Sequence, residues 1–152
     1  MRMRSALRPH LWRMMQIVRD QGGVSAIEFA IILPLLITLV FGIIEFSIFL
    51  YDKAVITNAS REGARAGIVF ADPRVDDGSI QAVVNNYCQD NLITFGGATG
   101  PSTTVTHAGS GVAGDSLTVQ VTYRYDFLVI PNFVPGLGAG VDLVAETIMR
   151  LE

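Results

Sequence analysis

The sequence predicts an α+β protein in which a long N-terminal helix, part of it spanning a membrane, packs on a small antiparallel sheet with a second, short helix. Two observations predict these parts. The run 29–50 contains a single charged residue, Glu45, and the last third of the chain alternates apolar and polar residues. A helix of that length rises about 33 Å, which matches the hydrocarbon core of a bilayer.

The helical pattern continues beyond the apolar run. The segment 51–69 has no proline, and its apolar residues recur at helical spacing among charged ones. We therefore expect one helix over 24–69, with a transmembrane part at 29–50. Pro34 should kink this helix, because its ring removes a backbone hydrogen bond.

The remainder, 70–152, is predicted to form a small α+β domain. A turn rich in aspartate leads to a short helix over 79–93, and "STTVTH", "SLTVQVTYRYDF" and "VDLVAETIMRLE" read as three strands. A domain of this size has little core of its own, so we expect it to dock on the exposed half of the long helix. The residues that should share the buried face of the middle strand are Leu117, Val119, Val121 and Tyr123.

The apolar run divides the charge of the chain. Residues 1–23 carry five arginines and one acidic residue, whereas the rest carries 6 basic and 13 acidic residues. Basic residues are retained on the cytoplasmic side, so we expect 1–23 to be a cytoplasmic leader and 70–152 to lie across the membrane. The arginines fit this topology better than nucleic-acid binding, because they form no continuous patch on a folded domain.

Few residues are available for catalysis or metal binding. His10 lies in the basic segment, His107 is the other histidine, and Cys88 is the single cysteine, so no internal disulfide can form. Carboxylates do not cluster at ligand spacing. We therefore expect no enzyme activity, no catalytic residue, no metal and no cofactor, and we interpret Cys88 as a small buried residue.

Glu28 stands in the apolar stretch "GGVSAIEFAIILPLL", five residues after Gly23. It is either a carboxylate at the membrane edge without a special role, or an ionisable residue that marks a partner in an apolar helix. Cleavage after Gly23 would create an ammonium group on Val24. The Glu28 carboxylate of a neighbouring subunit could then neutralise that charge, which is costly when left unpaired in a low-dielectric bundle.

A basic leader, a glycine and a glutamate five residues later in an apolar helix resemble the leader of type IV pilins and pseudopilins. The following stretch, "SAIEFAIILPLLITLVFGIIEFSIFLYDKAVITNASREGARAGIV", is similar to the TadE-like family. The closing stretches "VTYRYDFLVIPNFVPG" and "AETIMRLE" are similar less specifically. The matching positions are Glu28-Phe29, Pro34, Gly42, Glu45-Phe46 and the "REGAR" of Arg61 to Arg65.

The resemblance implies a pilin-like fold and a minor pseudopilin of the Tad/Flp pilus machine in the bacterial inner membrane, acting in pilus assembly and surface adherence. A prepilin peptidase would cut between Gly23 and Val24, and Gly22 and Gly23 would interrupt the helix so that extended backbone enters the protease. The implied partners are this peptidase, other pilins and pseudopilins, inner-membrane Tad assembly proteins and membrane lipid.

Several positions keep two interpretations. Pro34 is either a tolerated kink or a packing site in subunit assembly, and Glu45 either reaches the membrane surface or has a charged or hydrogen-bonding partner. The charged residues of "REGAR" form either a solvated helix face or contacts between subunits. The candidate subunit contacts are Phe29, Glu45, Arg61, Glu62 and Arg65.

Two alternatives to this function stay open. One is an uncleaved, single-pass, membrane-anchored periplasmic binding module, in which Glu28 is only an interfacial charge. The other is a type II secretion-like or TadF-type pseudopilin, which shares the processing but works in another position or machine. Retention or loss of the leader separates the first alternative from the pseudopilins.

Overall fold

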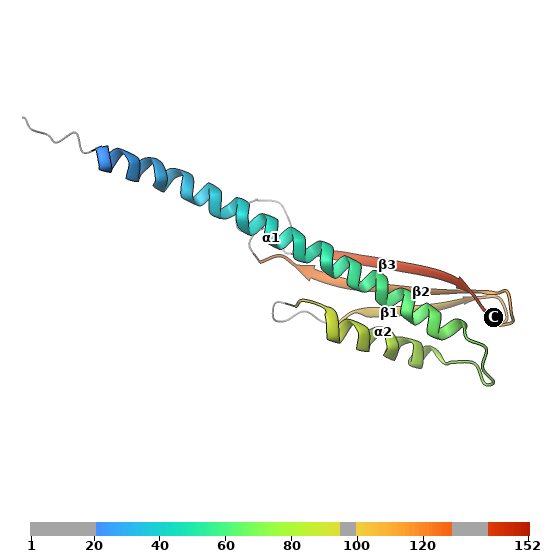
Figure 1. The fold of residues 1–152 in the computed structure, drawn as a ribbon. Coiled ribbons are helices and arrows are strands. Elements are labelled where there is room, and N and C mark those ends of the chain that lie inside the picture. Colours follow the sequence, from blue (N-terminus) through green and yellow to red (C-terminus); the bar gives the residue numbers. More distant parts are fainter. Residues whose placement is uncertain (1–20, 95–99, 129–139) are drawn as a thin grey trace, which may run out of the picture. The chain divides into compact units, whose positions relative to one another are not determined.

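The computed structural model describes residues 21–94, 100–128 and 140–152 (Figure 1). These residues form two helices and three strands, and the chain divides into two compact units at residues 37 and 38, within the first helix. The predicted α+β class is therefore confirmed. The elements in chain order are α1 (Gln21–Ile68), α2 (Asp77–Asn91), β1 (Ser102–Ala108), β2 (Ser116–Asp126) and β3 (Gly140–Arg150).

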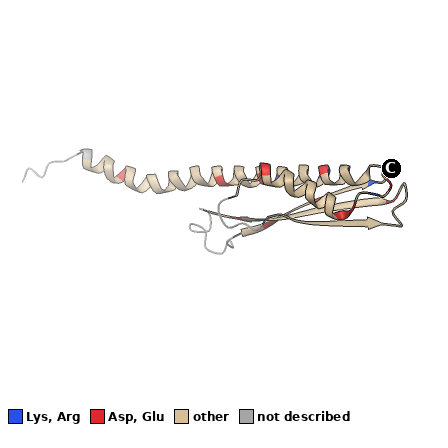
Figure 2. Ribbon diagram, turned by 90° about the horizontal axis from the view of Figure 1, so that it is seen from below, with Lys and Arg blue, Asp and Glu red and all other residues tan. Residues whose placement is uncertain are grey.

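In the first unit, the described residues 21–37 are the beginning of α1, and their large apolar side chains other than that of Leu33 are exposed. Figure 2 shows few charged residues on this part of the helix. Among the described residues, α1 contains the one helical segment that is long and apolar enough to cross a membrane, which fits a single-pass membrane protein. The helix begins three residues before the predicted Val24 and ends one residue before Val69.

The second unit is built on a three-stranded antiparallel sheet in the order β1-β2-β3. The register pairs Val105 with Val119 and Val121 with Ala145, so these apolar residues share one face. Alternate residues of β2 are buried on that face, because successive side chains of a strand point to opposite sides. The predicted four residues from Leu117 to Tyr123 are all buried, and Tyr125 extends the row.

Helix α1 covers the apolar face of this sheet with one side of its C-terminal half (Figure 1). The buried positions of α1 recur every three or four residues, which keeps them on one side of a helix. Two contacts tie this side to β3: Ser60 Oγ lies 2.7 Å from Thr147 Oγ1, and Lys53 Nζ donates to the carbonyl oxygen of Val144. The buried residues of α1 are Glu45, Asp52, Val55, Ile56, Ala59, Ser60, Gly63, Ala64 and Gly67.

Helix α2 packs beside α1 and next to β1. Asp76 caps it, because its carboxylate accepts hydrogen bonds from the backbone N–H (3.1 Å) and the hydroxyl (2.6 Å) of Ser79. These bonds lower the pKa of Asp76. The cap places the start of α2 at Asp77, two residues before the predicted start. The side chains of α2 that enter the core are Ile80, Val84 and Cys88.

Candidate functional site

The predicted processing residues lie on the exposed beginning of α1. Gly23, Val24, Glu28 and Phe29 are all exposed to solvent in the structure, and all four are helical. Cleavage after Gly23 and charge neutralisation by Glu28 stay predictions, because both involve other protein chains. The apolar side chains around these residues give Glu28 no neighbour of opposite charge within the described part of the first unit.

The expectation that Gly22 and Gly23 interrupt the helix is wrong. Both residues lie inside the first turn of α1, which begins at Gln21. A glycine lowers helix stability by only about 1 kcal/mol relative to alanine, so two glycines weaken the first turn without excluding it. An extended substrate backbone at this point therefore requires the first turn of α1 to open.

Pro34 lies inside α1, and the helix is continuous through it. Gly42, the next matching position, is only partly buried, and nothing lies within 4 Å of the point where its Cβ would be. A kink at Pro34 and a role of this region in subunit packing stay predictions. The surface around Gly42 is open in the isolated chain.

Glu45 is the first buried residue of α1, and it is only 4% exposed. Its carboxylate oxygen Oε1 accepts a hydrogen bond from the backbone N–H of Leu128, just after β2. The hydroxyl of Tyr125 donates to the backbone carbonyl of Glu45 over 3.3 Å. Glu45 therefore has hydrogen-bonding partners within its own chain, and its contact with another subunit stays a prediction.

Tyr125 is buried beside Glu45 and holds the end of β2 against α1. Burial raises its pKa to about 12, and the carboxylates of Glu45 and Asp52 act in the same direction. The hydroxyl therefore stays protonated at neutral pH and serves as a donor. The ring of Tyr125 lies 5.5 Å from that of Phe49 and 5.4 Å from that of Phe127, both edge-to-face.

Asp52 is a buried carboxylate that the sequence reasoning missed. It lies seven residues after Glu45, hence on the same side of α1, and is fully buried. Its Oδ1 accepts a hydrogen bond of 3.0 Å from the backbone N–H of Ile93, while its buried Oδ2 has no hydrogen-bond partner among the described residues. Burial raises the pKa of Asp52, against the opposing effect of the Ile93 hydrogen bond. The seven-residue spacing between Glu45 and Asp52, which places both on one side of a helix, was the sequence signal that could have indicated this buried carboxylate.

The "REGAR" segment has a charged side and a packed side. Arg61, Glu62 and Arg65 are exposed, as a solvated helix face requires, and their subunit contacts stay predictions. Gly63 and Gly67 are buried at the crossing of α1 with α2 and β2. A Cβ on Gly63 would lie 2.5 Å from Val84 Cγ2, and one on Gly67 would lie 2.4 Å from Leu117 Cδ2. The glycines therefore allow the helices and sheet to approach closely.

Cys88 is buried in the core, as interpreted from the sequence. Burial raises the pKa of its thiol to about 11, so the thiol is protonated and unreactive at neutral pH. A pocket of about 200 Å³ next to it is lined by Leu92, Pro101 and Tyr123, among others. Within the described ranges, no group of three or more His, Cys, Asp or Glu residues could hold a metal ion.

Comparison with known protein families gives a match. The model of the family described as TadE-like protein matches residues 23–65. No curated protein and no solved structure matches the chain significantly. The matched segment begins at Gly23, includes Glu28 and Glu45, and ends with "REGAR". The resemblance to the TadE-like family is therefore confirmed over residues 23–65, and it indicates a protein related to the Tad pilus.

Proposed function

We propose that this chain is a minor pseudopilin of a Tad/Flp-type pilus, processed by a prepilin peptidase after Gly23 and acting in pilus assembly for surface adherence. The observation that carries the proposal is the TadE-like match, which starts at Gly23 and covers the apolar helix with its glutamate. The helix is long enough to hold the chain in the bacterial inner membrane before assembly. The role is structural, and it requires neither a cofactor nor a metal.

The topology follows from the charge of the two ends. The arginine-rich segment 1–23 stays in the cytoplasm, where the peptidase acts, and the sheet domain lies in the periplasm. Removal of the leader gives Val24 a free ammonium group. The exposed Glu28 of a neighbouring pilin or pseudopilin neutralises this group, which favours lateral packing of the helices.

The processing step is tested on protein extracted from membranes of cells with and without the prepilin peptidase. Intact mass and N-terminal sequence should show a chain that begins at Val24 only when the peptidase is present. Gly23→Leu is the matched variant, and it should keep the leader because the bulky residue blocks the scissile position. A chain that keeps its leader beside active peptidase would instead be an uncleaved, membrane-anchored binding module.

The assembly step is tested separately with Glu28→Gln, which removes the charge and keeps the size. This variant should be cleaved but should fail to assemble with other pilins, since the Val24 ammonium group then has no counter-charge. Glu146→Gln is the control, because it removes an exposed carboxylate from β3, outside the apolar helix. If both variants assembled equally well, Glu28 would have no role in assembly. A type II secretion-like or TadF-type role would appear as assembly with partners of that other position or machine.

A further inference from the structure

We propose that one end of the sheet domain rests on the lipid surface and that the bilayer ends at Glu45, not at Leu50. This end, the aromatic end, consists of Phe46 and Phe49 of α1 with Tyr125, Phe127 and Leu128. The inference requires that α1 spans the bilayer. It does not require cleavage after Gly23, so the two proposals fail independently.

The coverage of α1 gives the boundary. Large apolar side chains are exposed along Val24–Ile44, and Glu45 is then the first buried residue of α1, in contact with Tyr125 and Leu128. A helix of that length rises about 31 Å, close to the thickness of the hydrocarbon core. If the bilayer extended to Leu50, the hydrogen bonds of Glu45 to Leu128 and Tyr125 would place the end of β2 within the hydrocarbon. The sheet domain therefore meets α1 at Glu45, while the outer side of the helix stays apolar and exposed through Phe46, Leu50 and Tyr51.

The composition of the aromatic end suits a membrane interface. The Phe46 and Phe49 rings stack with centroids 6.0 Å apart, and Phe49 stacks on Phe127 at 6.2 Å. Phe46 is 56% exposed and Leu128 is 50% exposed, although neighbouring aromatic rings are packed. The surface that this end offers is therefore apolar and is formed by Phe46 and Leu128, while Tyr125 is buried with its hydroxyl bonded to Glu45.

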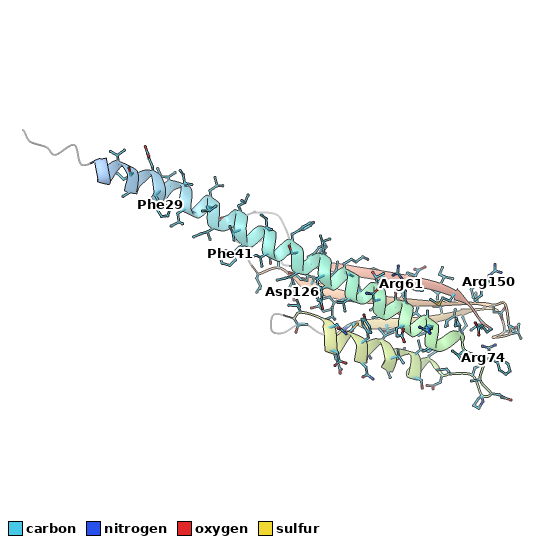
Figure 3. All side chains as sticks on the ribbon, in the orientation of Figure 1. Phe29, Phe41, Arg61, Arg74, Asp126 and Arg150 are labelled. Carbon is cyan, nitrogen blue, oxygen red and sulfur yellow. The ribbon has the colours of Figure 1, made fainter. Side chains whose placement is uncertain are left out.

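Charged residues begin directly beside this apolar surface. Asp126 ends β2, and its carboxylate lies 3.5 Å from Arg124 Nε, while Arg124 Nη1 lies 3.3 Å from Asp142 of β3. Figure 3 places Asp126 and Phe41 toward the same end of the second unit, and Arg74 and Arg150 toward the other. The apolar aromatic end is thus followed by paired charges, as the acyl chains of a bilayer are followed by headgroups. The aromatic end is also continuous with the apolar part of α1, which favours lipid as its occupant.

The test places a single tryptophan at chosen positions of the full chain in vesicles of phosphatidylcholine, at a protein-to-lipid ratio low enough to keep copies apart. The background is Trp12→Phe, which removes the native tryptophan. Leu128→Trp reports on the aromatic end, and Phe70→Trp is the control, because Phe70 is 74% exposed just after α1 ends. Quenching is measured with lipids brominated near the headgroup and with aqueous acrylamide.

Leu128→Trp should lose most of its fluorescence to brominated lipid and be shielded from acrylamide, whereas Phe70→Trp should respond in the opposite way. Leu128→Trp that responds to acrylamide and not to brominated lipid would mean that the domain stands clear of the bilayer. Leu128→Trp that responds to neither quencher would mean that protein covers the aromatic end. Either result overturns the proposal. Stronger quenching of Leu128→Trp by lipids brominated deep in the acyl chains than by lipids brominated near the headgroup would restore the boundary at Leu50, because Leu128 is bonded to Glu45.

Discussion

The close approach at Gly63 gives a stability prediction that the structure makes quantitative. In Gly63→Ala the new Cβ would lie 2.5 Å from Val84 Cγ2, but at ordinary distances of 3.5 and 3.6 Å from Val119 and Ile80. Carbon atoms favour separations of about 3.5–4.0 Å, so one contact must lengthen by roughly 1 Å. Val84 is fully buried on a helix, where a β-branched side chain has essentially one rotamer, so it cannot turn away.

The expected energies follow from this single clash. Overpacking of a core costs about 1–3 kcal/mol, and alanine in place of glycine returns about 1 kcal/mol of helix propensity. Gly63→Ala should therefore lower the free energy of unfolding by about 0–2 kcal/mol. Val84→Ala should lower it by about 2 kcal/mol, because it removes two buried carbons and leaves a cavity. The double variant should be less destabilised than the sum by about 1–3 kcal/mol, since the new methyl group occupies the vacated space.

The assay is denaturant unfolding of the full chain in detergent micelles, followed by circular dichroism for the wild type, both single variants and the double variant. The coupling energy of the cycle cancels the change in helix propensity, which is the same with either residue at 84. Gly42→Ala is the control, because nothing lies within 4 Å of its Cβ position and it should not couple to Val84→Ala. Additivity of Gly63→Ala and Val84→Ala within about 0.5 kcal/mol would refute the close-packing argument.

Three further predictions concern charge and processing. Burial raises the pKa of Asp52 above its value in the unfolded chain, so the protonated form favours folding, and stability should fall as the pH rises through the folded-state pKa. Asp52→Asn, whose amide oxygen can still accept the hydrogen bond from Ile93, should flatten the pH dependence of the melting temperature. An unchanged pH profile in this variant would contradict the prediction. Gly22→Ala should slow leader removal about fivefold, because alanine stabilises the first turn of α1 by about 1 kcal/mol. The rate is measured in a pulse-chase experiment, and an unchanged rate would mean that the turn does not have to open. His107 Nε2 lies 2.7 Å from Asp77 Oδ1 in an exposed pair, so His107→Ala should change the free energy of unfolding by less than about 1 kcal/mol, and a larger loss would show that the pair matters more than its exposure indicates.

The elements of the fold could be predicted because their signals are local. The apolar run of α1 and the alternation of β2 each follow from a short period of the sequence. The boundaries differ by one to three residues, where caps such as Asp76 decide the first turn. The one local argument that failed concerns Gly22, where glycine propensity predicted an interruption and the helix nevertheless continues.

The partners of the buried carboxylates could not be predicted, because they depend on residues far along the chain. Glu45 bonds to Leu128, 83 positions away, and Asp52 bonds to Ile93, 41 positions away. The first bond requires the sheet to be docked on α1 in one position, and the second requires the same of α2. No local pattern of the sequence encodes these positions. The sequence predicted that Glu45 would have either a partner or a route to water, but only the docked sheet distinguishes them.

The first and last described elements, α1 and β3, are neighbours, and this affects how the domain is made. β3 pairs with β2 along its whole length, and the backbone N–H of Glu152 donates to the carbonyl oxygen of Ile68 at the end of α1 over 3.2 Å. The apolar side of α1 is therefore synthesised long before the strand that completes its cover. Contacts between distant segments form slowly, and exposed apolar surface and strand edges favour aggregation in the interval. The apolar side of α1 thus stays uncovered by the completed sheet until β3 has been synthesised.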